Sequence, residues 1–155
     1  MSSDLTSRRP LVDTVIGSLR ALAAEIDHLD EIAAARLGVN RTDLRCLERL
    51  GATGATSPTV LAVALGLTTG GMTAVIDRLE QAGYARRRPD PRDRRKIIVE
   101  GTDQLAARQE EIFGALLRET RTLVASYSDA ELELIRDFLE RSRAVIQGPA
   151  NPASS

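Results

Sequence analysis

The segment from Leu65 to Thr102 constrains the fold of this chain more than any other part. Between Arg86 and Lys96 it holds seven basic residues against two acidic ones, a local net charge of +5 in a chain whose net charge is −1. Positive charge is therefore gathered in one short segment instead of being spread over the surface. This concentration predicts a contact with phosphate groups, and a solvated basic surface is the alternative interpretation.

Two short helices joined by a turn are predicted just before the basic run. Ser57 followed by Pro58 is typical of a helix cap and a first helical residue, and this helix ends at Gly66. After the turn, a second helix runs to Gly83. Its apolar face consists of Met72, Val75, Ile76 and Leu79, and its outer face of Thr69, Gly70, Thr73, Asp77 and Glu80. The pair matches a helix-turn-helix.

A β-hairpin is predicted after the second helix. Residues 84–88 and 95–100 can form two strands around a loop of residues 89–94. Along the second strand, Ile97 and Val99 alternate with Ile98. The two prolines of the loop stiffen it and exclude it from a central strand. The arginines are therefore expected on a semi-rigid tip.

Long helices are predicted on the N-terminal side of these elements. Residues 1–10 are expected to form a flexible polar lead-in, after which a helix runs from Pro10 to Arg36. Its apolar residues recur at alternating steps of three and four, which is typical of a seam along another helix. These residues are Val12, Val15, Leu19, Leu22, Ile26, Leu29 and Ala33. A further helix starts at Asn40 or Thr42 and ends at Gly51.

Two more helices are predicted in the last third of the chain. Thr102 caps the first, which ends near Tyr127 and whose apolar side holds Leu105, Ile112, Leu116 and Leu123. Ser128 and Glu131 match the capping box of the second. Its apolar residues are Leu132, Ile135, Leu139 and Val145 or Ile146. Residues 148–155 are of types that build no core, and they predict a disordered tail.

The composition favours one mainly helical folding unit. A length of 155 residues favours a single unit, and 3% aromatic residues favour packed helices with a small β element over a β-sandwich. The first ten residues lack the apolar stretch of a signal peptide, and no apolar run reaches the roughly 20 residues that cross a bilayer. We therefore expect a soluble, cytoplasmic protein without a membrane partner.

With these elements in place, the sequence resembles the MarR family of winged helix-turn-helix transcriptional regulators. The resemblance covers residues 11–146, and its most specific part is RLEQAGYARR leading into DPRDRR. It implies a mainly α fold with a small β-hairpin wing, a DNA-binding lobe in residues 38–101, and dimerisation helices in residues 11–37 and 102–147. It further implies a ligand-responsive repressor that binds a pseudo-palindromic operator as a homodimer.

The resemblance also implies specific DNA contacts, with the second helix of the helix-turn-helix in the major groove and the wing in the adjacent minor groove. Arg95 matches the arginine inserted into the minor groove and Asp93 the carboxylate that orients it, while Arg92 and Arg94 lie near flanking phosphates. The predicted DNA-binding residues are Ser57, Thr59, Thr68, Thr69, Gly70, Thr73, Arg78, Arg88, Arg92, Asp93, Arg94 and Arg95. No cofactor is implied. The expected effector is an aromatic acid or a phenol, bound in a pocket lined by the first, second and fifth helices.

Two features depart from the commoner family pattern. Gly70 and Gly71 lie in the first turns of the second helix, at a cost of about 1 kcal/mol each relative to alanine if both are helical. They can let DNA approach the backbone closely. Ala74 stands where many members carry a basic residue. The hydroxyl donors that remain belong to Thr68, Thr69 and Thr73. Sequence choice is therefore expected to depend more on DNA shape than on direct readout.

Other interpretations stay open. A helical interaction module can keep this fold without specific DNA binding. An enzyme is less favoured, because there is no glycine-rich phosphate loop and no catalytic or metal-ligand cluster. Cys46 is expected to be a buried, inert thiol instead of a redox switch, and His28 a surface or interface residue instead of a metal or pH site. The Asp93–Arg95 pair can also serve only to stabilise a turn.

Overall fold

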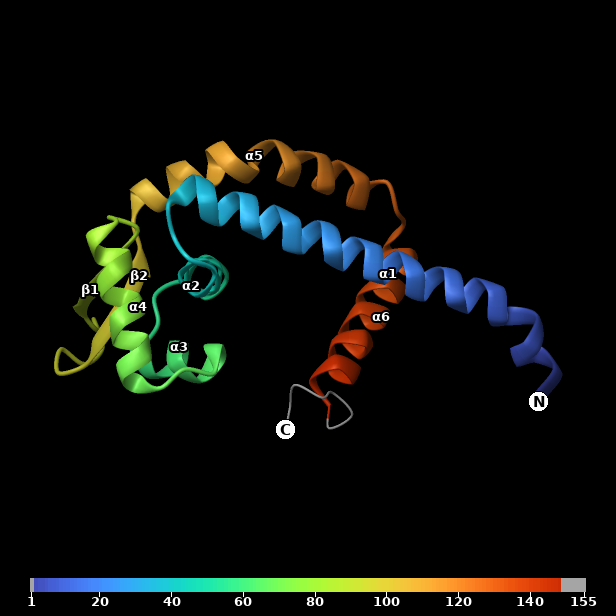
Figure 1. Cartoon of the computed structure of the whole chain (residues 1–155), viewed down its shortest axis with the longest axis horizontal. Coiled ribbons are helices and arrows are strands. Elements are labelled where there is room, and N and C mark those ends of the chain that lie inside the picture. Colours follow the sequence, from blue (N-terminus) through green and yellow to red (C-terminus); the bar gives the residue numbers. More distant parts are fainter. Residues whose placement is uncertain (1, 149–155) are drawn as a thin grey trace. The chain divides into compact units, whose positions relative to one another are not determined.

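The structure is a computed structural model in which residues 2–148 are described, with side chains from Arg9 onward (Figure 1). The chain forms two compact units, one ending at Ile112 and one beginning at Phe113, where its length predicted a single folding unit. The described residues are mainly helical with one antiparallel two-stranded sheet, as predicted. The first unit holds the helix-turn-helix and the hairpin.

Helix α1 (Ser2–Leu37) begins earlier than predicted. Residues 2–10, expected as a flexible lead-in, are helical, and Pro10 lies inside the helix. A proline can do so because its fixed φ is helical, at the cost of one backbone hydrogen bond. The C-terminal end of α1 is capped by other elements. The Tyr84 hydroxyl donates to the carbonyl of Leu37 at 3.1 Å, and the Arg108 guanidinium donates to the carbonyl of Arg36 at 2.9 Å.

Helix α2 (Arg41–Thr53) starts as predicted and ends later. The side chain of Asn40 accepts a hydrogen bond from the backbone N–H of Asp43 at 2.9 Å, which confirms Asn40 as the cap. The predicted end at Gly51 is wrong, because the helix continues past it and leaves through Gly54, whose φ is 70°. Gly51 has ordinary helical conformation and room beside it, so nothing there forces a turn.

Helix α3 (Pro58–Leu65) confirms the first half of the helix-turn-helix. The Ser57 hydroxyl accepts from the backbone N–H of Val60 at 3.3 Å, and Gly66 ends the helix in the left-handed conformation. The chain then turns directly into the second helix.

Helix α4 (Thr69–Gln81) confirms the second half. Thr68 caps it by accepting from the backbone N–H of Gly71 at 3.1 Å, so Gly70 and Gly71 are both helical. The predicted apolar face is buried in full: Met72, Val75, Ile76 and Leu79. The outer face is exposed except for Glu80, which is half-buried.

Strands β1 (Ala85–Pro89) and β2 (Ile97–Gly101) form the predicted hairpin, which lies beside α4 in Figure 1. Pro89 lies in β1 at its end instead of in the loop, which is tolerated because β1 is an edge strand.

The predicted alternation along β2 is wrong, because Ile98 and Val99 are both buried. The second edge of β2 is occupied: Val99 exchanges backbone hydrogen bonds of 2.8 and 3.0 Å with Thr56, in the segment before α3. Ile98, on the other face, lines a hollow together with Ala55 and Pro91. With Ile98 8% and Val99 0% exposed, both faces of the hairpin are buried at these two residues.

Helix α5 (Asp103–Ala125) begins in the first unit. The Thr102 hydroxyl accepts from the backbone N–H of Leu105 at 3.2 Å, as expected of a cap, and donates to the carbonyl of Gly83 at 2.6 Å. Helix α6 (Asp129–Gln147) belongs to the second unit and has the predicted capping box in full. Of the predicted disordered tail, residues 149–155 lie outside the described part of the chain.

Large apolar side chains of α1 and α6 are exposed in the single chain. Leu22 and Ile26 in α1 are 55% and 51% exposed, and Leu139 and Ile146 in α6 are 50% and 65% exposed. Of the predicted α1 seam, only Ala33 is buried. Rows of exposed large apolar side chains on a helix are typical of a face that another protein surface covers.

Among residues 2–148, no single helix has the length and apolar character to cross a membrane. The bent pair α3 and α4 reaches that length and composition together, but the two helices are bent by 109° and α4 buries its apolar face in the core.

Candidate nucleic-acid interface

An ion pair between Arg78 and Asp43 holds helix α4 against helix α2. Arg78 donates from Nε to Asp43 Oδ2 at 3.0 Å and from Nη2 to Asp43 Oδ1 at 2.6 Å, and Asp43 is 3% exposed. These hydrogen bonds raise the pKa of Arg78. Arg78 was predicted to contact DNA, but in the structure its guanidinium is hydrogen-bonded to Asp43 and holds the fold together. Any DNA contact through its remaining N–H groups stays a prediction.

Two arginines of β1 are held by one carboxylate of β2. Arg86 and Arg88 contact Glu100 at 2.7 and 2.6 Å, and their hydrogen bonds, that of Arg88 first, lower the pKa of Glu100. Arg88 was predicted to bind DNA, yet its guanidinium has a carboxylate partner within the hairpin. Arg86 and Arg88 therefore serve to join the two strands.

Arg87 joins the hairpin to the helix-turn-helix. Its guanidinium contacts Asp77 at 2.7 Å and also pairs with Glu80, while its backbone N–H donates to Glu80 Oε1 at 2.7 Å. Both carboxylates belong to α4. This clamp fixes the direction of the wing relative to α4, and it neutralises Asp77 on the exposed face of that helix.

The tip of the wing is different. Arg92, Arg94 and Arg95 are exposed, and their guanidinium groups form no hydrogen bond or ion pair with the described residues. The arginines of this segment thus form two groups. The strand arginines, Arg86, Arg87 and Arg88, have carboxylate partners, whereas the tip arginines, Arg92, Arg94 and Arg95, have none among the described residues. Lys96 lies between, with its Nζ 3.8 Å from Asp93. The tip arginines are the ones whose charge is available to a phosphate backbone.

Asp93 acts on the backbone of Arg95. Its Oδ1 accepts the backbone N–H of Arg95 at 3.2 Å, and its ion pair is with Lys96. The expected orientation of the Arg95 guanidinium by this carboxylate is absent from the described contacts. Asp90, which the sequence reasoning did not single out, makes the same bond to the backbone N–H of Arg92 at 2.8 Å.

The threonine set of α4 offers different chemistry from that predicted. The Thr73 hydroxyl donates to the carbonyl of Thr69 at 3.0 Å, so toward DNA it presents an acceptor instead of a donor. Thr68 and Ser57 use a lone pair to cap their helices. The remaining members of the predicted set, Thr59, Thr69 and Gly70, are exposed.

Sequence reasoning missed the carboxylates that hold the interface in shape. Glu100 faces Arg86 directly in the hairpin register, so a cross-strand reading of the two predicted strands was a signal for that pair. Asp43 and Arg78 are 35 positions apart, and no local pattern connects them.

The two isolated reactive side chains are not part of this surface. Cys46 is fully buried, as predicted, and burial together with the nearby charge of Asp43 raises its pKa to about 11. The low reactivity of the thiol stays a prediction. His28 is exposed, 3.9 Å from Glu31. In the part of the chain with described side chains, no cluster of His, Cys, Asp or Glu can hold a metal ion.

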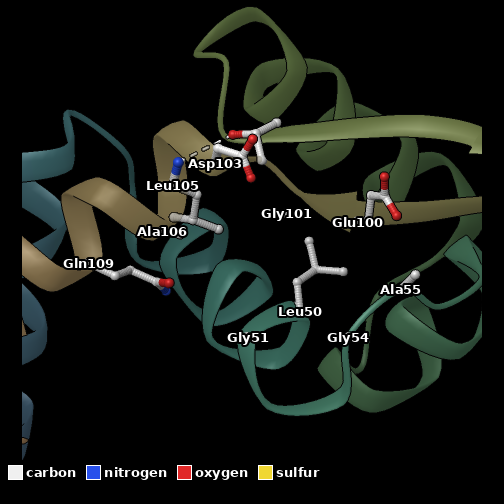
Figure 2. A pocket seen from close by; sticks show the side chains of 11 residues that line it. Leu50, Gly51, Gly54, Ala55, Glu100, Gly101, Asp103, Leu105, Ala106 and Gln109 are labelled. Carbon is white, nitrogen blue, oxygen red and sulfur yellow. Dashed lines mark hydrogen bonds between the residues drawn. The ribbon is translucent and has the colours of Figure 1, made fainter.

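A hollow of about 330 Å³ lies at the base of the wing (Figure 2). Its walls come from the end of α2, the end of β2 and the start of α5, so α1 does not line it. Leu50, Leu105 and Ala106 supply its apolar part, and Asp103 and Gln109 its polar part. The carboxylate of Glu100, at its edge, is already occupied by the strand arginines.

Comparison with known proteins agrees with this geometry. The model of the MarR family matches residues 37–96. The HTH-type transcriptional regulator YcgE of Bacillus subtilis (strain 168) is 32% identical over 145 residues, covering 94% of each chain, and PecS of Dickeya dadantii (strain 3937) is 32% identical over 142 residues, covering 87% of this chain and 86% of PecS.

Structural likeness confirms the fold. The crystal structure of the MarR family transcription regulator SP03579 superposes with a TM-score of 0.64 at 21% identity, covering 95% of this chain and 99% of the other. The sequence relatives are transcriptional regulators and not enzymes. The chain therefore belongs to the MarR family of winged helix-turn-helix, DNA-binding transcriptional regulators.

Proposed function

We propose that this regulator is a ligand-responsive repressor that binds a pseudo-palindromic operator as a homodimer. In each subunit α4 enters the major groove, and the wing tip enters the adjacent minor groove. The two α4 helices address half-sites about one helical turn apart. A protein-interaction module without DNA binding is not favoured by the family of the chain.

One observation supports the proposed DNA-binding surface. Arg92, Arg94 and Arg95 are exposed without partners among the described side chains, at the end of a hairpin that Arg87 clamps to α4. A guanidinium without an internal partner can bind phosphate, or enter a narrow minor groove, at no cost in broken ion pairs. The clamp holds the tip in a fixed direction from the helix that enters the major groove.

The test is duplex binding by fluorescence anisotropy across a salt series. The probes are the DNA upstream of the protein's own coding sequence, a duplex selected by the protein from a random-sequence library, and a scrambled control. The double variant Arg92→Ala/Arg95→Ala is expected to bind more weakly and with a smaller salt slope, by about 0.9 for each phosphate that the variant no longer neutralises.

Arg45→Ala/Arg49→Ala is the matched control. Both arginines are exposed on α2 and form no side-chain hydrogen bond or ion pair with a described residue. This control removes the same charge away from α4 and the wing, so it should keep most of the affinity and slope. If the two double variants lose the same amount of duplex affinity, the wing tip contributes only as general surface charge, and the proposal is overturned.

For the effector, we propose the hollow at the base of the wing. An apolar wall with a few polar groups is typical of small-molecule sites. Asp103 disfavours an anion there, so a neutral phenol fits better than an aromatic acid. Phenol is expected to weaken operator binding at concentrations where benzoate does not, and Ala106→Trp, which fills the hollow, should abolish the response. A response to benzoate alone would place the effector elsewhere.

A further inference from the structure

The wing tip contains the same three-residue unit twice. Asp90-Pro91-Arg92 and Asp93-Arg94-Arg95 each begin with an aspartate whose Oδ1 accepts the backbone N–H of the arginine two positions later, at 2.8 and 3.2 Å. This is an Asx turn, which asparagine makes as well as aspartate. Backbone hydrogen bonds of 2.8 Å from Asp90 N to Lys96 O and from Lys96 N to Asp93 O close the loop around both units.

The two carboxylates do not hold the arginine side chains. Within the described residues, neither Asp90 nor Asp93 pairs with a tip guanidinium, and Asp93 lies 3.8 Å from Lys96 Nζ instead. Both partners of that pair are substantially exposed, so it contributes only about 0–1 kcal/mol to stability. What the aspartates supply is therefore the course of the backbone that presents Arg92 and Arg95.

The carboxylates of Asp90 and Asp93 have the same sign of charge as the phosphates of DNA. Residues 90–96 hold four basic side chains and two aspartates, a net charge of +2. When the tip lies against DNA, both carboxylates are brought close to phosphates of the same sign, and the repulsion acts within the screening length of about 10 Å at 0.1 M salt. Asparagine at both positions keeps the turns and raises the net charge of the tip to +4.

We infer that Asp90 and Asp93 are positioning residues that present Arg92 and Arg95 through two successive backbone turns, and that their negative charge weakens DNA binding. The inference rests on the proposed placement of the wing tip against DNA. It differs from orientation of a guanidinium by a carboxylate, in which the charge is the required part.

Two double variants of equal charge separate these roles. Asp90→Asn/Asp93→Asn keeps the turn acceptors, and Asp90→Ala/Asp93→Ala removes them. The probe is the duplex selected by the unaltered full-length protein, and affinity is read by anisotropy across a salt series. The asparagine variant is expected to bind roughly threefold to tenfold more tightly than the unaltered protein at low salt, with the advantage shrinking as salt rises. The alanine variant should bind severalfold more weakly than the asparagine variant.

The comparison between the two variants isolates the turns, because both lack the same two charges. Equal affinity of the two would overturn the turn-based role, and weaker binding by the asparagine variant than by the unaltered protein would show that the carboxylate charge is required. Circular dichroism melts check that all variants fold alike. If Arg92→Ala/Arg95→Ala binds as well as the unaltered protein, the proposed wing contact itself fails, which is a distinct result.

Discussion

At the scale of single residues, Gly70 is a glycine for which the fold gives no reason. Its φ is not positive, and nothing lies within 4 Å of the position that a Cβ would take. Gly70→Ala is therefore expected to stabilise the protein by about 0.5–1 kcal/mol in denaturant unfolding. It should weaken duplex binding about fivefold to tenfold, because the added methyl group stands between the α4 backbone and DNA and costs about 1 kcal/mol.

Gly51→Ala is the control for this prediction. Gly51 is also helical, and an added Cβ would meet nothing closer than Gln109 Nε2 at 3.8 Å. It should give a similar gain in stability without a change in DNA affinity. If Gly70→Ala binds DNA as tightly as the unaltered protein, close approach of DNA at Gly70 is excluded.

The Asp43–Arg78 pair also acts at this scale. Arg78→Ala leaves the buried Asp43 carboxylate without its partner, and a loss of about 2–4 kcal/mol in the free energy of unfolding is expected. Adding Asp43→Ala to it should cost less than Asp43→Ala costs in the unaltered protein, because the two side chains depend on each other. Strictly additive losses in urea unfolding would mean that the pair does not fix α4 on α2.

At the scale of elements, the helices and their caps were predictable because the signals are local. Ser57 and Ser128, both predicted as caps, each accept a hydrogen bond from a backbone N–H three residues ahead, so the sequence contains the whole interaction. Thr68, which was predicted as part of the turn and not as a cap, makes the same bond. The burial along the second strand was predicted less well, since the second partner of Val99 is Thr56, far away in sequence. The division of the wing arginines was not predictable either: a charge count gives their number, whereas the folded hairpin decides which have partners.

The pH dependence of thermal stability tests the role of Glu100 in the hairpin. Arg88 and Arg86 hold the pKa of Glu100 below its ordinary value of 4.5. The folded state therefore favours the carboxylate. This stabilisation is fully present above pH 4.5 and is lost as pH falls below it through the lowered pKa. Glu100→Gln should lower the thermal midpoint at pH 7, and the gap to the unaltered protein should narrow below pH 4.5.

Glu119→Gln serves as the matched control, since Glu119 is exposed on α5 and forms no ion pair with the described residues. It should change the thermal midpoint little at either pH. A gap for Glu100→Gln that stays constant from pH 7 to pH 3 would mean that the bonds to the strand arginines do not stabilise the fold.

At the scale of the whole molecule, exposed apolar surface on α1 and α6 implies that another protein surface covers these helices in the functional protein. MarR family regulators bind DNA as dimers, and a second copy of this chain is the partner that we propose for these faces. A carboxylate placed in such an interface loses water without gaining a partner, at a cost of several kcal/mol. Leu22→Glu, at a residue 55% exposed in the single chain, is therefore expected to give monomers in sedimentation equilibrium.

The same variant should lose DNA affinity by a factor on the order of 100 or more, because a monomer presents one recognition helix and forfeits the second half-site. Ala24→Glu introduces the same charge on the opposite face of α1 and should leave both the dimer and the affinity in place. A Leu22→Glu protein that stays dimeric would move the interface away from the α1 seam. A monomer that still binds the full operator tightly would show that each subunit reads DNA independently, so the pairing of half-sites would have to come from the DNA and not from the protein.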